Sequence, residues 1–200
     1  KSNRECTYTP VGKSIAGCAT VTPITVTYTG QSWPANVGAY AVTPKTGYVA
    51  KNNNTATATC VQEIYTIKLN ATQNGGTGTL DAIYEKYNTG WYSDSVTNVS
   101  ISSVPIPTKA NSVFNGYYTA ATGGTQRITK TGELPAPTFT ASTTLYAQFS
   151  ACAACTKGKG VKSCSASVTD NACAYSATCS NGYKNPTCDS AGKCSCTGNT

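Results

Sequence analysis

The cysteines of this 200-residue chain are spread unevenly, and their distribution limits what the chain can fold into. Eight of them fall between positions 152 and 196, and none lies between positions 60 and 152. A cytosolic protein would need a metal or a redox reaction to explain such density, whereas an oxidising compartment explains it by disulfides. We therefore expect an extracellular protein in which every cysteine is a disulfide candidate: Cys6, Cys18, Cys60, Cys152, Cys155, Cys164, Cys173, Cys179, Cys188, Cys194 and Cys196.

The cysteine total is odd and the spacing does not reveal the pairing. The odd cysteine is a free thiol, forms a bridge to another molecule, or has a partner outside this sequence. The chain has neither an initiator Met nor a signal peptide, so we expect a mature product or a fragment of a longer array.

The cysteines also divide the chain into three expected segments. Residues 1–60 form a β-rich segment with three cysteines, residues 61–150 form a cysteine-free module, and residues 151–200 form a cysteine-rich module. The last segment has few large apolar residues and cannot build an ordinary core. We expect it to be loop-rich and held by disulfides.

The residue pattern favours a mainly β fold, with an α+β fold as the alternative. Threonine is abundant, and β-branched side chains suit a pleated surface. Ile24, Val26 and Tyr28 alternate with threonines, which predicts a strand with one apolar face. Asn74-Gly75-Gly76 predicts a turn with positive φ angles, and Asn52-Asn53-Asn54 predicts a loop.

Residues 65–149 carry a series of motifs in a recognisable order. Tyr65-Thr66-Ile67-Lys68-Leu69-Asn70 comes first, then Pro105-x-Pro107, Phe114-x-Gly116-Tyr117-Tyr118 and Leu145-Tyr146-Ala147. This series resembles the Listeria–Bacteroides repeat, the B repeat of internalin B, and covers about 85 residues. The sequence departs from the family at Asn111-Ser112, where the family has Gly-Tyr, and at Tyr117, where the family has Trp.

The resemblance implies a small β-grasp-like sheet packed against a short helix or loop. In that setting Phe114 and Tyr118 would share one face of a strand, because side chains alternate with period two. Leu145 and Ala147 or Tyr146 would meet them from a neighbouring strand, and Gly116 would allow a close crossing or a bulge beneath the aromatic residues.

The sequence offers no recognisable catalytic, cofactor or metal site. The chain lacks His, which removes the usual general base and most catalytic zinc sites. Its acids lie in no catalytic motif, and Asp81 and Glu85 are expected on the solvent face of a strand. Cys152-x-x-Cys155 has the spacing of zinc ribbons and redox sites, but the second close pair or the βαβ context is missing. We therefore predict a protein that is not an enzyme.

Three aromatic residues are candidates for ligand contact: Trp33, Trp91 and Tyr92. They could stack on a sugar, although the preferred interpretation places Trp91 and Tyr92 over a small core. The net charge is +7, but the cations are scattered rather than clustered, which argues against a nucleic-acid partner. No apolar run is long enough for a membrane span.

These patterns together predict a structural and adhesive part of a secreted or cell-surface bacterial repeat protein. Its expected partner is a host or matrix protein or a glycan, with self-association as a further expectation. The alternatives are a self-assembling extracellular filament subunit and a carbohydrate-binding module of a secreted enzyme.

Overall fold

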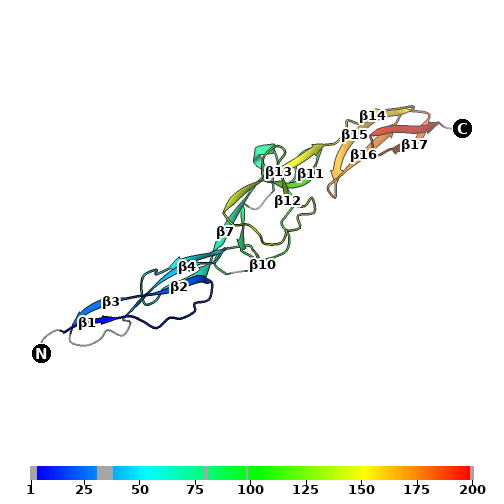
Figure 1. Ribbon diagram of the computed structural model, residues 1–200. Helices are drawn as coiled ribbons and strands as arrows, with labels where there is room; N and C mark the ends of the chain where they lie inside the picture. Colours follow the sequence, from blue (N-terminus) through cyan, green and yellow to red (C-terminus); the bar gives the residue numbers. More distant parts are fainter. Residues whose placement is uncertain (1–3, 31–37, 79–80, 98, 199–200) are drawn as a thin grey trace. The chain divides into compact units, whose positions relative to one another are not determined.

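A computed structural model describes residues 4–30, 38–78, 81–97 and 99–198. Within these ranges the chain is almost entirely strands and turns, and its only helical element is the single 3-10 turn η1 (Thr72–Asn74) (Figure 1). The mainly β prediction is therefore confirmed, and no α-helix among the described residues supports the α+β alternative.

The strands have the following bounds: β1 (Arg4–Tyr8), β2 (Cys18–Ile24), β3 (Val26–Gly30), β4 (Ala39–Pro44), β5 (Tyr48–Lys51), β6 (Thr59–Gln62), β7 (Ile64–Asn70), β8 (Ala82–Lys86), β9 (Gly90–Tyr92), β10 (Ser100–Ile101), β11 (Ser112–Tyr118), β12 (Gln126–Ile128), β13 (Thr143–Ala151), β14 (Thr156–Lys157), β15 (Val161–Thr169), β16 (Ala172–Cys179), β17 (Tyr183–Cys188) and β18 (Lys193–Gly198). The largest sheet has seven strands in the order β10-β9-β8-β7-β13-β11-β12. The other described sheets have two or three strands.

The chain divides into two compact units. The first unit comprises Lys1–Thr66, Tyr84–Val99 and Ala136–Ser142, and the second comprises Ile67–Ile83, Ser100–Pro135 and Thr143–Thr200. Each unit is described by itself below.

The first unit contains three antiparallel ribbons, β1–β3, β2–β4 and β5–β6. A disulfide between Cys18 and Cys60 joins β2 to β6 and packs with the buried Val42 and Ala58. The bridge spans a sequence separation of 42 residues. Closing a loop of that length lowers the entropy of the unfolded chain by an amount worth about 4 kcal/mol.

The predicted strand around Ile24, Val26 and Tyr28 is divided in the structure. β2 ends at Ile24 and pairs with β4, whereas β3 begins at Val26 and pairs with β1. Alternation predicts which side chains share a face, but it does not say where a chain changes its pairing partner. The predicted Asn52–Asn54 loop is confirmed, since Asn52 and Asn54 have positive φ and the Asn53 Oδ1 accepts a hydrogen bond from the Val42 N–H at 2.8 Å.

The second unit is organised around β13, which pairs in parallel with β7 and antiparallel with β11. Its core includes residues that are at most 5% exposed, among them Ile67, Leu69, Phe114, Tyr117, Ile128, Leu145 and Ala147. The predicted turn at Asn74-Gly75-Gly76 is present as η1 followed by Gly75 at φ +74. The Asn74 side chain holds this turn by donating to the carbonyls of Ala121 and Ala147.

A bulge in β11 changes which aromatic residues share a face. Phe114 pairs with Phe149 but Gly116 pairs with Gln148, so the register shifts by one residue at the predicted bulge. The buried partner of Phe114 is consequently Tyr117, with ring centroids 5.2 Å apart, and not Tyr118, which is only half-buried. The expectation for Tyr118 was wrong because period-two alternation does not continue through a bulge.

The cysteine-rich segment is held by disulfides as predicted, but it is built of strands rather than loops. β15 and β16 form a hairpin, and β17 pairs with β18, which also pairs in parallel with β14. Asp170 and Asn171, both at positive φ, form the two-residue turn of the hairpin. Asp and Asn tolerate this conformation, and positive φ at both positions matches the twist of a tight hairpin.

We predict that Gly116→Ala lowers the free energy of unfolding of the second unit by about 2–3 kcal/mol. Gly116 has φ +130, and a Cβ there would lie 2.5 Å from the Ile128 carbonyl oxygen and the Gln126 Nε2. Gly123→Ala is the matched control, because Gly123 also has positive φ but a Cβ there meets no atom within 4 Å. Urea denaturation should show a loss of only about 1 kcal/mol for the control. Equal losses for both variants would contradict the role given to the bulge.

Candidate functional site

The turn of the β15–β16 hairpin docks on β11 through one side chain, that of Asn171. Its Oδ1 accepts a hydrogen bond from the Phe114 N–H at 2.6 Å, and its Nδ2 donates to the carbonyls of Phe114 at 2.8 Å and Lys130 at 3.3 Å. The amide thus engages both backbone groups of Phe114, much as a residue of a neighbouring strand would.

A covalent bond reinforces this docking. Cys152, which follows β13 directly, forms a disulfide with Cys173 in β16. The Cys152 N–H also donates to the carbonyl of Asn111 at 2.8 Å. The hairpin is therefore attached to the seven-stranded sheet by a disulfide and by hydrogen bonds.

A groove of about 960 Å³ lies between the docked hairpin and the segment that leads into β11. Ile106, Pro107 and Ala110 line one part of it, and Ala166 and Val168 of β15 line another. Lys109 and Asp170 contribute one charge of each sign. The groove is thus largely apolar and carries no net charge, which suits a neutral partner.

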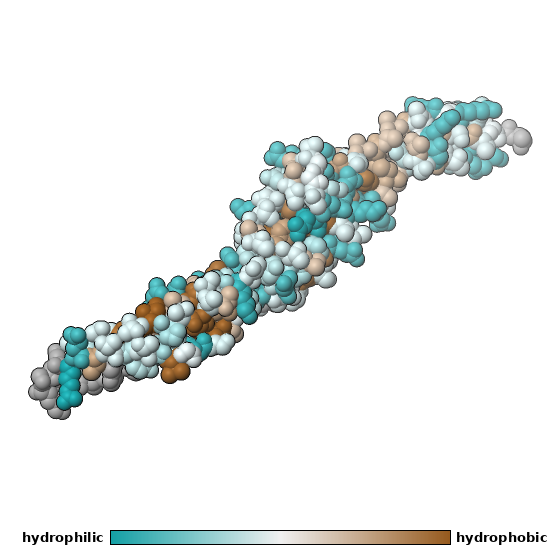
Figure 2. Space-filling view, viewed as in Figure 1, coloured by the Kyte–Doolittle hydropathy of each residue, from teal (hydrophilic) through white to brown (hydrophobic). Residues whose placement is uncertain are grey.

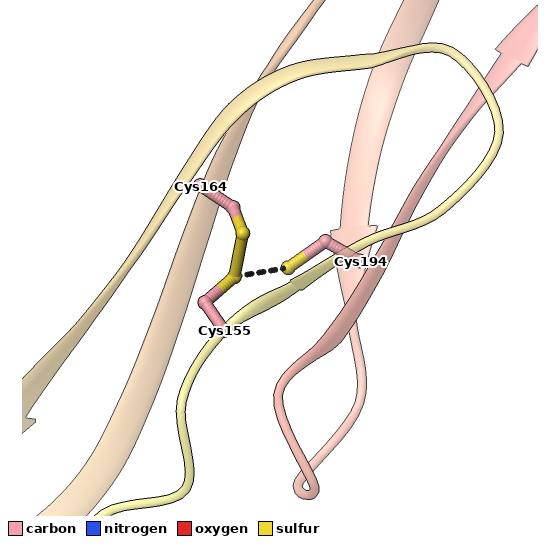
Figure 3. A group of neighbouring side chains, drawn as sticks. All are labelled: Cys155, Cys164 and Cys194. Carbon is pink, nitrogen blue, oxygen red and sulfur yellow. Dashed lines mark hydrogen bonds between the residues drawn. A yellow bond between two sulfur atoms is a disulfide. The ribbon is translucent and has the colours of Figure 1, made fainter.

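Two disulfides pack against each other in the cysteine-rich segment. Cys155 is bonded to Cys164, and its Sγ lies 3.4 Å from the Sγ of Cys194 (Figure 3). Cys194 is in turn bonded to Cys188. The Cys194 side chain is fully buried. Together these sulfur atoms take the place of an apolar core in a segment that has few large side chains.

The spacing of these sulfur atoms would also suit a soft metal ion. The Sγ atoms of Cys155, Cys164 and Cys194 lie within 4.8 Å of one another. A metal requires thiolates, however, and each of these sulfurs is already bonded to another sulfur. In the oxidised chain the cluster is therefore a cross-link rather than a set of metal ligands.

The Cys152-x-x-Cys155 spacing does not form a redox pair. Cys152 bonds to Cys173 and Cys155 bonds to Cys164, whereas a thioredoxin-like pair would bond to itself. A fifth disulfide joins Cys179 to Cys196, and the odd cysteine is Cys6, a half-buried thiol in β1. The prediction of disulfides is confirmed for ten of the eleven candidates.

The expectation for Glu85 was wrong. Asp81 is exposed as predicted, but Glu85 is fully buried and its Oε1 accepts a hydrogen bond from the Phe139 N–H at 2.8 Å. A segment 54 residues further along the chain covers this face of β8, which alternation within the strand could not reveal. Other acids bond within their own turns: Asp94 accepts from Val96 N–H, and Asp189 from Lys193 N–H.

Tyr65 lies in the same part of the first unit and has a perturbed pKa. Burial raises the pKa of its hydroxyl above the usual value of 10.0, because the charged phenolate would lose its hydration. A hydrogen bond to Glu63 and the negative charges of Glu63 and Glu85 raise this pKa further.

The three aromatic residues that were candidates for ligand contact differ in their burial. Trp91 is buried and meets Phe139 edge-on, with ring centroids 5.7 Å apart, which confirms its interpretation as a core residue. Tyr92 is half-buried and the Lys86 Nζ lies 4.9 Å from its ring centroid. Trp33 lies outside the described residues. The ring of Trp91 is therefore not presented for stacking on a sugar.

The surface seen in Figure 2 is mostly polar or intermediate in hydropathy, with scattered apolar patches. Among the described residues, the large apolar side chains that are clearly exposed include Val11, Val96 and Val99. No helix in the described part of the chain is long and apolar enough to cross a membrane.

The fold and the disulfides define a mainly β, multiply cross-linked protein of an oxidising, extracellular environment. Comparisons with family models, with curated proteins and with solved structures find no match to this chain. The resemblance of residues 65–149 to the Listeria–Bacteroides repeat therefore stays a prediction.

Sequence reasoning missed Asn171 and the groove beside it. The Asp170-Asn171 pair between two alternating Ser/Ala-rich runs was a signal for a two-residue hairpin. That signal does not reveal that the Asn171 side chain would reach back across 57 residues to Phe114.

We predict that Asn171→Gly loosens the docked hairpin while leaving its turn intact, because Gly also adopts positive φ. Loss of the bonds to Phe114 and Lys130 should cost about 1–3 kcal/mol and speed hydrogen exchange of the Phe114 amide. Asp170→Gly, in the same turn, is the matched control. A Phe114 amide that is equally protected in both variants would show that Asn171 does not hold the hairpin.

A second prediction concerns pH. Since the pKa of Tyr65 is higher in the folded chain, its contribution to stability is present below pH 10.0 and is lost as the pH rises above that value. The free energy of unfolding should therefore fall more steeply above pH 10.0 in the wild type than in Tyr65→Phe. Urea denaturation across this range measures the slopes. Parallel slopes, or a wild-type minus variant absorbance difference that titrates at pH 10.0 or below, would contradict the assignment.

Proposed function

We propose that this chain is a structural, adhesive part of a secreted or cell-surface bacterial repeat protein, without catalytic activity. The observation that best supports this proposal is the set of disulfide cross-links. Four of the five disulfides lie within residues 152–196, a segment of thin ribbons with few large apolar side chains. Such cross-links stabilise a small extracellular domain and resist proteolysis where chaperones and repair are absent.

We also propose that residues 65–149 form a Listeria–Bacteroides-type repeat with a β-grasp-like sheet. The mixed arrangement of β7, β13 and β11 supports this proposal, as does the short turn η1 beside β13. Phe114, Leu145 and Ala147, three residues of the motif series, are buried together in the core of that sheet.

The proposed partner is a host or matrix protein or a glycan. The described surface is rich in Thr, Ser and Asn hydroxyl and amide groups and has few charges, which suits weak polar contacts rather than one deep site. Weak sites that are linked in an array gain apparent affinity because the second binding event is intramolecular.

The self-assembling filament subunit is the second candidate. It is favoured because no strand among the described residues pairs with the outer edge of β15. The carbohydrate-binding module is less well supported, because Trp91 faces the core and not the solvent.

The adhesive role predicts that many copies of the chain displayed together bind a surface with higher apparent affinity than a single copy does. We expect a biotinylated chain on streptavidin to bind immobilised mucin, collagen or a glycan array with about 100-fold higher apparent affinity than the monomer. Surface plasmon resonance measures both forms. The control is the same display of the chain after reduction and alkylation, which should lose binding. Absence of binding by the multivalent, oxidised form to every one of these surfaces would contradict the adhesive proposal.

A further inference from the structure

Four cysteine sulfurs gather at one point of the cysteine-rich segment. The Cys155 Sγ lies 3.4 Å from the Cys194 Sγ, and the Cys164 Sγ lies within 4.8 Å of both (Figure 3). The fourth sulfur is that of Cys188, which is bonded to Cys194. All cysteines of the chain lie within the described ranges, and among them only Cys155, Cys164 and Cys194 form a group of three sulfurs this close together.

These distances are close to those of a tetrahedral thiolate site. At a Zn–S distance of about 2.3 Å, the sulfur atoms of a four-coordinate zinc site lie about 3.8 Å from one another. The 3.4 Å contact between Cys155 and Cys194 already approaches this spacing. After reduction, the sulfurs that are now bonded to each other need only separate by side-chain rotation to reach it.

Backbone hydrogen bonds hold Cys155 beside β18 without any help from the disulfides. The Thr156 N–H donates to the Gly192 carbonyl at 2.8 Å. The Gly158 N–H donates to the Cys194 carbonyl at 2.7 Å. These bonds belong to the parallel pairing of β14 with β18, which directly follows Cys155. The position of Cys155 relative to Cys194 is therefore fixed by the sheet as well as by sulfur bonds.

The turn between Cys188 and Cys194 is also held by its own hydrogen bonds. The Asp189 Oδ1 accepts from the Ala191 N–H at 3.0 Å and from the Lys193 N–H at 2.9 Å. The Asp189 N–H donates to the Lys193 carbonyl at 3.0 Å. Cys188 and Cys194 are directly opposite each other in the β17–β18 pairing. This turn therefore presents two sulfurs side by side whether or not they are bonded.

The charges of the surrounding sequence suit a group of thiolates. A zinc ion with four thiolate ligands carries two net negative charges. Residues 155–164 contain Lys157, Lys159 and Lys162 and no acid, and Lys193 immediately precedes Cys194. Nearby cations stabilise thiolates over thiols. The segment thus supplies positive charge next to the sulfurs.

We propose that the sulfurs of Cys155, Cys164, Cys188 and Cys194 form a zinc site when the chain is reduced, and two disulfides when it is oxidised. Each disulfide takes up two electrons and two protons from a reductant of the dithiol class, and Zn²⁺ then displaces the protons of the resulting thiols. Oxidation of the thiolates back to disulfides releases the zinc.

The zinc state has a structural consequence. The cysteine-rich segment has few large apolar side chains, so its reduced form needs another cross-link, and a structural metal supplies one. In the reduced chain zinc therefore keeps β14 against β18. This inference goes beyond the adhesive role, which concerns the oxidised chain, and does not depend on it.

The test is a zinc titration of the full chain, reduced with a phosphine under nitrogen, in competition with a chromophoric chelator. We expect the reduced chain to retain one zinc ion and the oxidised chain to retain none. Co²⁺ in place of zinc should give the absorption of tetrahedral thiolate coordination, and zinc should protect the Gly158 amide from hydrogen exchange. A reduced chain that retains no zinc, or an oxidised chain that binds zinc equally well, would overturn the proposal.

Single substitutions identify the ligands. Cys164→Ser and Cys188→Ser each remove one thiolate, and in the reduced chain they break no disulfide, so only the ligand set changes. Each should weaken zinc binding by about 100-fold or more. Cys196→Ser, in the same strand as Cys194, is the matched control and should leave the affinity unchanged. An equal loss in the control would show that zinc binds elsewhere. The adhesion assay uses the oxidised, zinc-free chain, so either proposal can fail without the other.

Discussion

The marginal stability of a narrow β-ribbon is the constraint on which this structure depends. An isolated two-stranded ribbon buries too little apolar surface to be stable in water. Outside the seven-stranded sheet, the described sheets of this protein have only two or three strands. Disulfides supply the missing stability, because they join neighbouring ribbons in the first unit and fasten nearly every strand of the cysteine-rich segment.

The seven-stranded sheet provides the conventional part of the core. β13 lies between β7 and β11, and its Leu145 and Ala147 are fully buried. The bulge at Gly116 brings Phe114 and Tyr117 together on the buried face of β11. The backbone of Phe114 in the same strand bonds to the Asn171 side chain, so Phe114 belongs to the conventional core and also contacts the cross-linked segment.

The contact between Asn171 and Phe114 stabilises the docked hairpin, and this hairpin also forms part of the surface on which the proposed functions depend. The docked hairpin forms one side of the groove. An adhesive array and a filament both need units that stay folded outside the cell and that present repeated, weak contacts. Cross-linked ribbons meet the first need, and surfaces of hydroxyl and amide groups suit the second.

Local patterns in the sequence were enough to predict the mainly β class, the turns at Asn52–Asn54 and Asn74–Gly76, and the oxidising compartment. These features depend on side-chain alternation, on residues that tolerate positive φ and on cysteine density, none of which requires knowledge of the tertiary contacts. Only the tertiary structure decided the disulfide pairing, the burial of Glu85 and the pairing of Phe114 with Tyr117 rather than Tyr118. Each of these depends on a bulge or on a segment tens of residues away, and no local pattern records which distant segment will cover a given face.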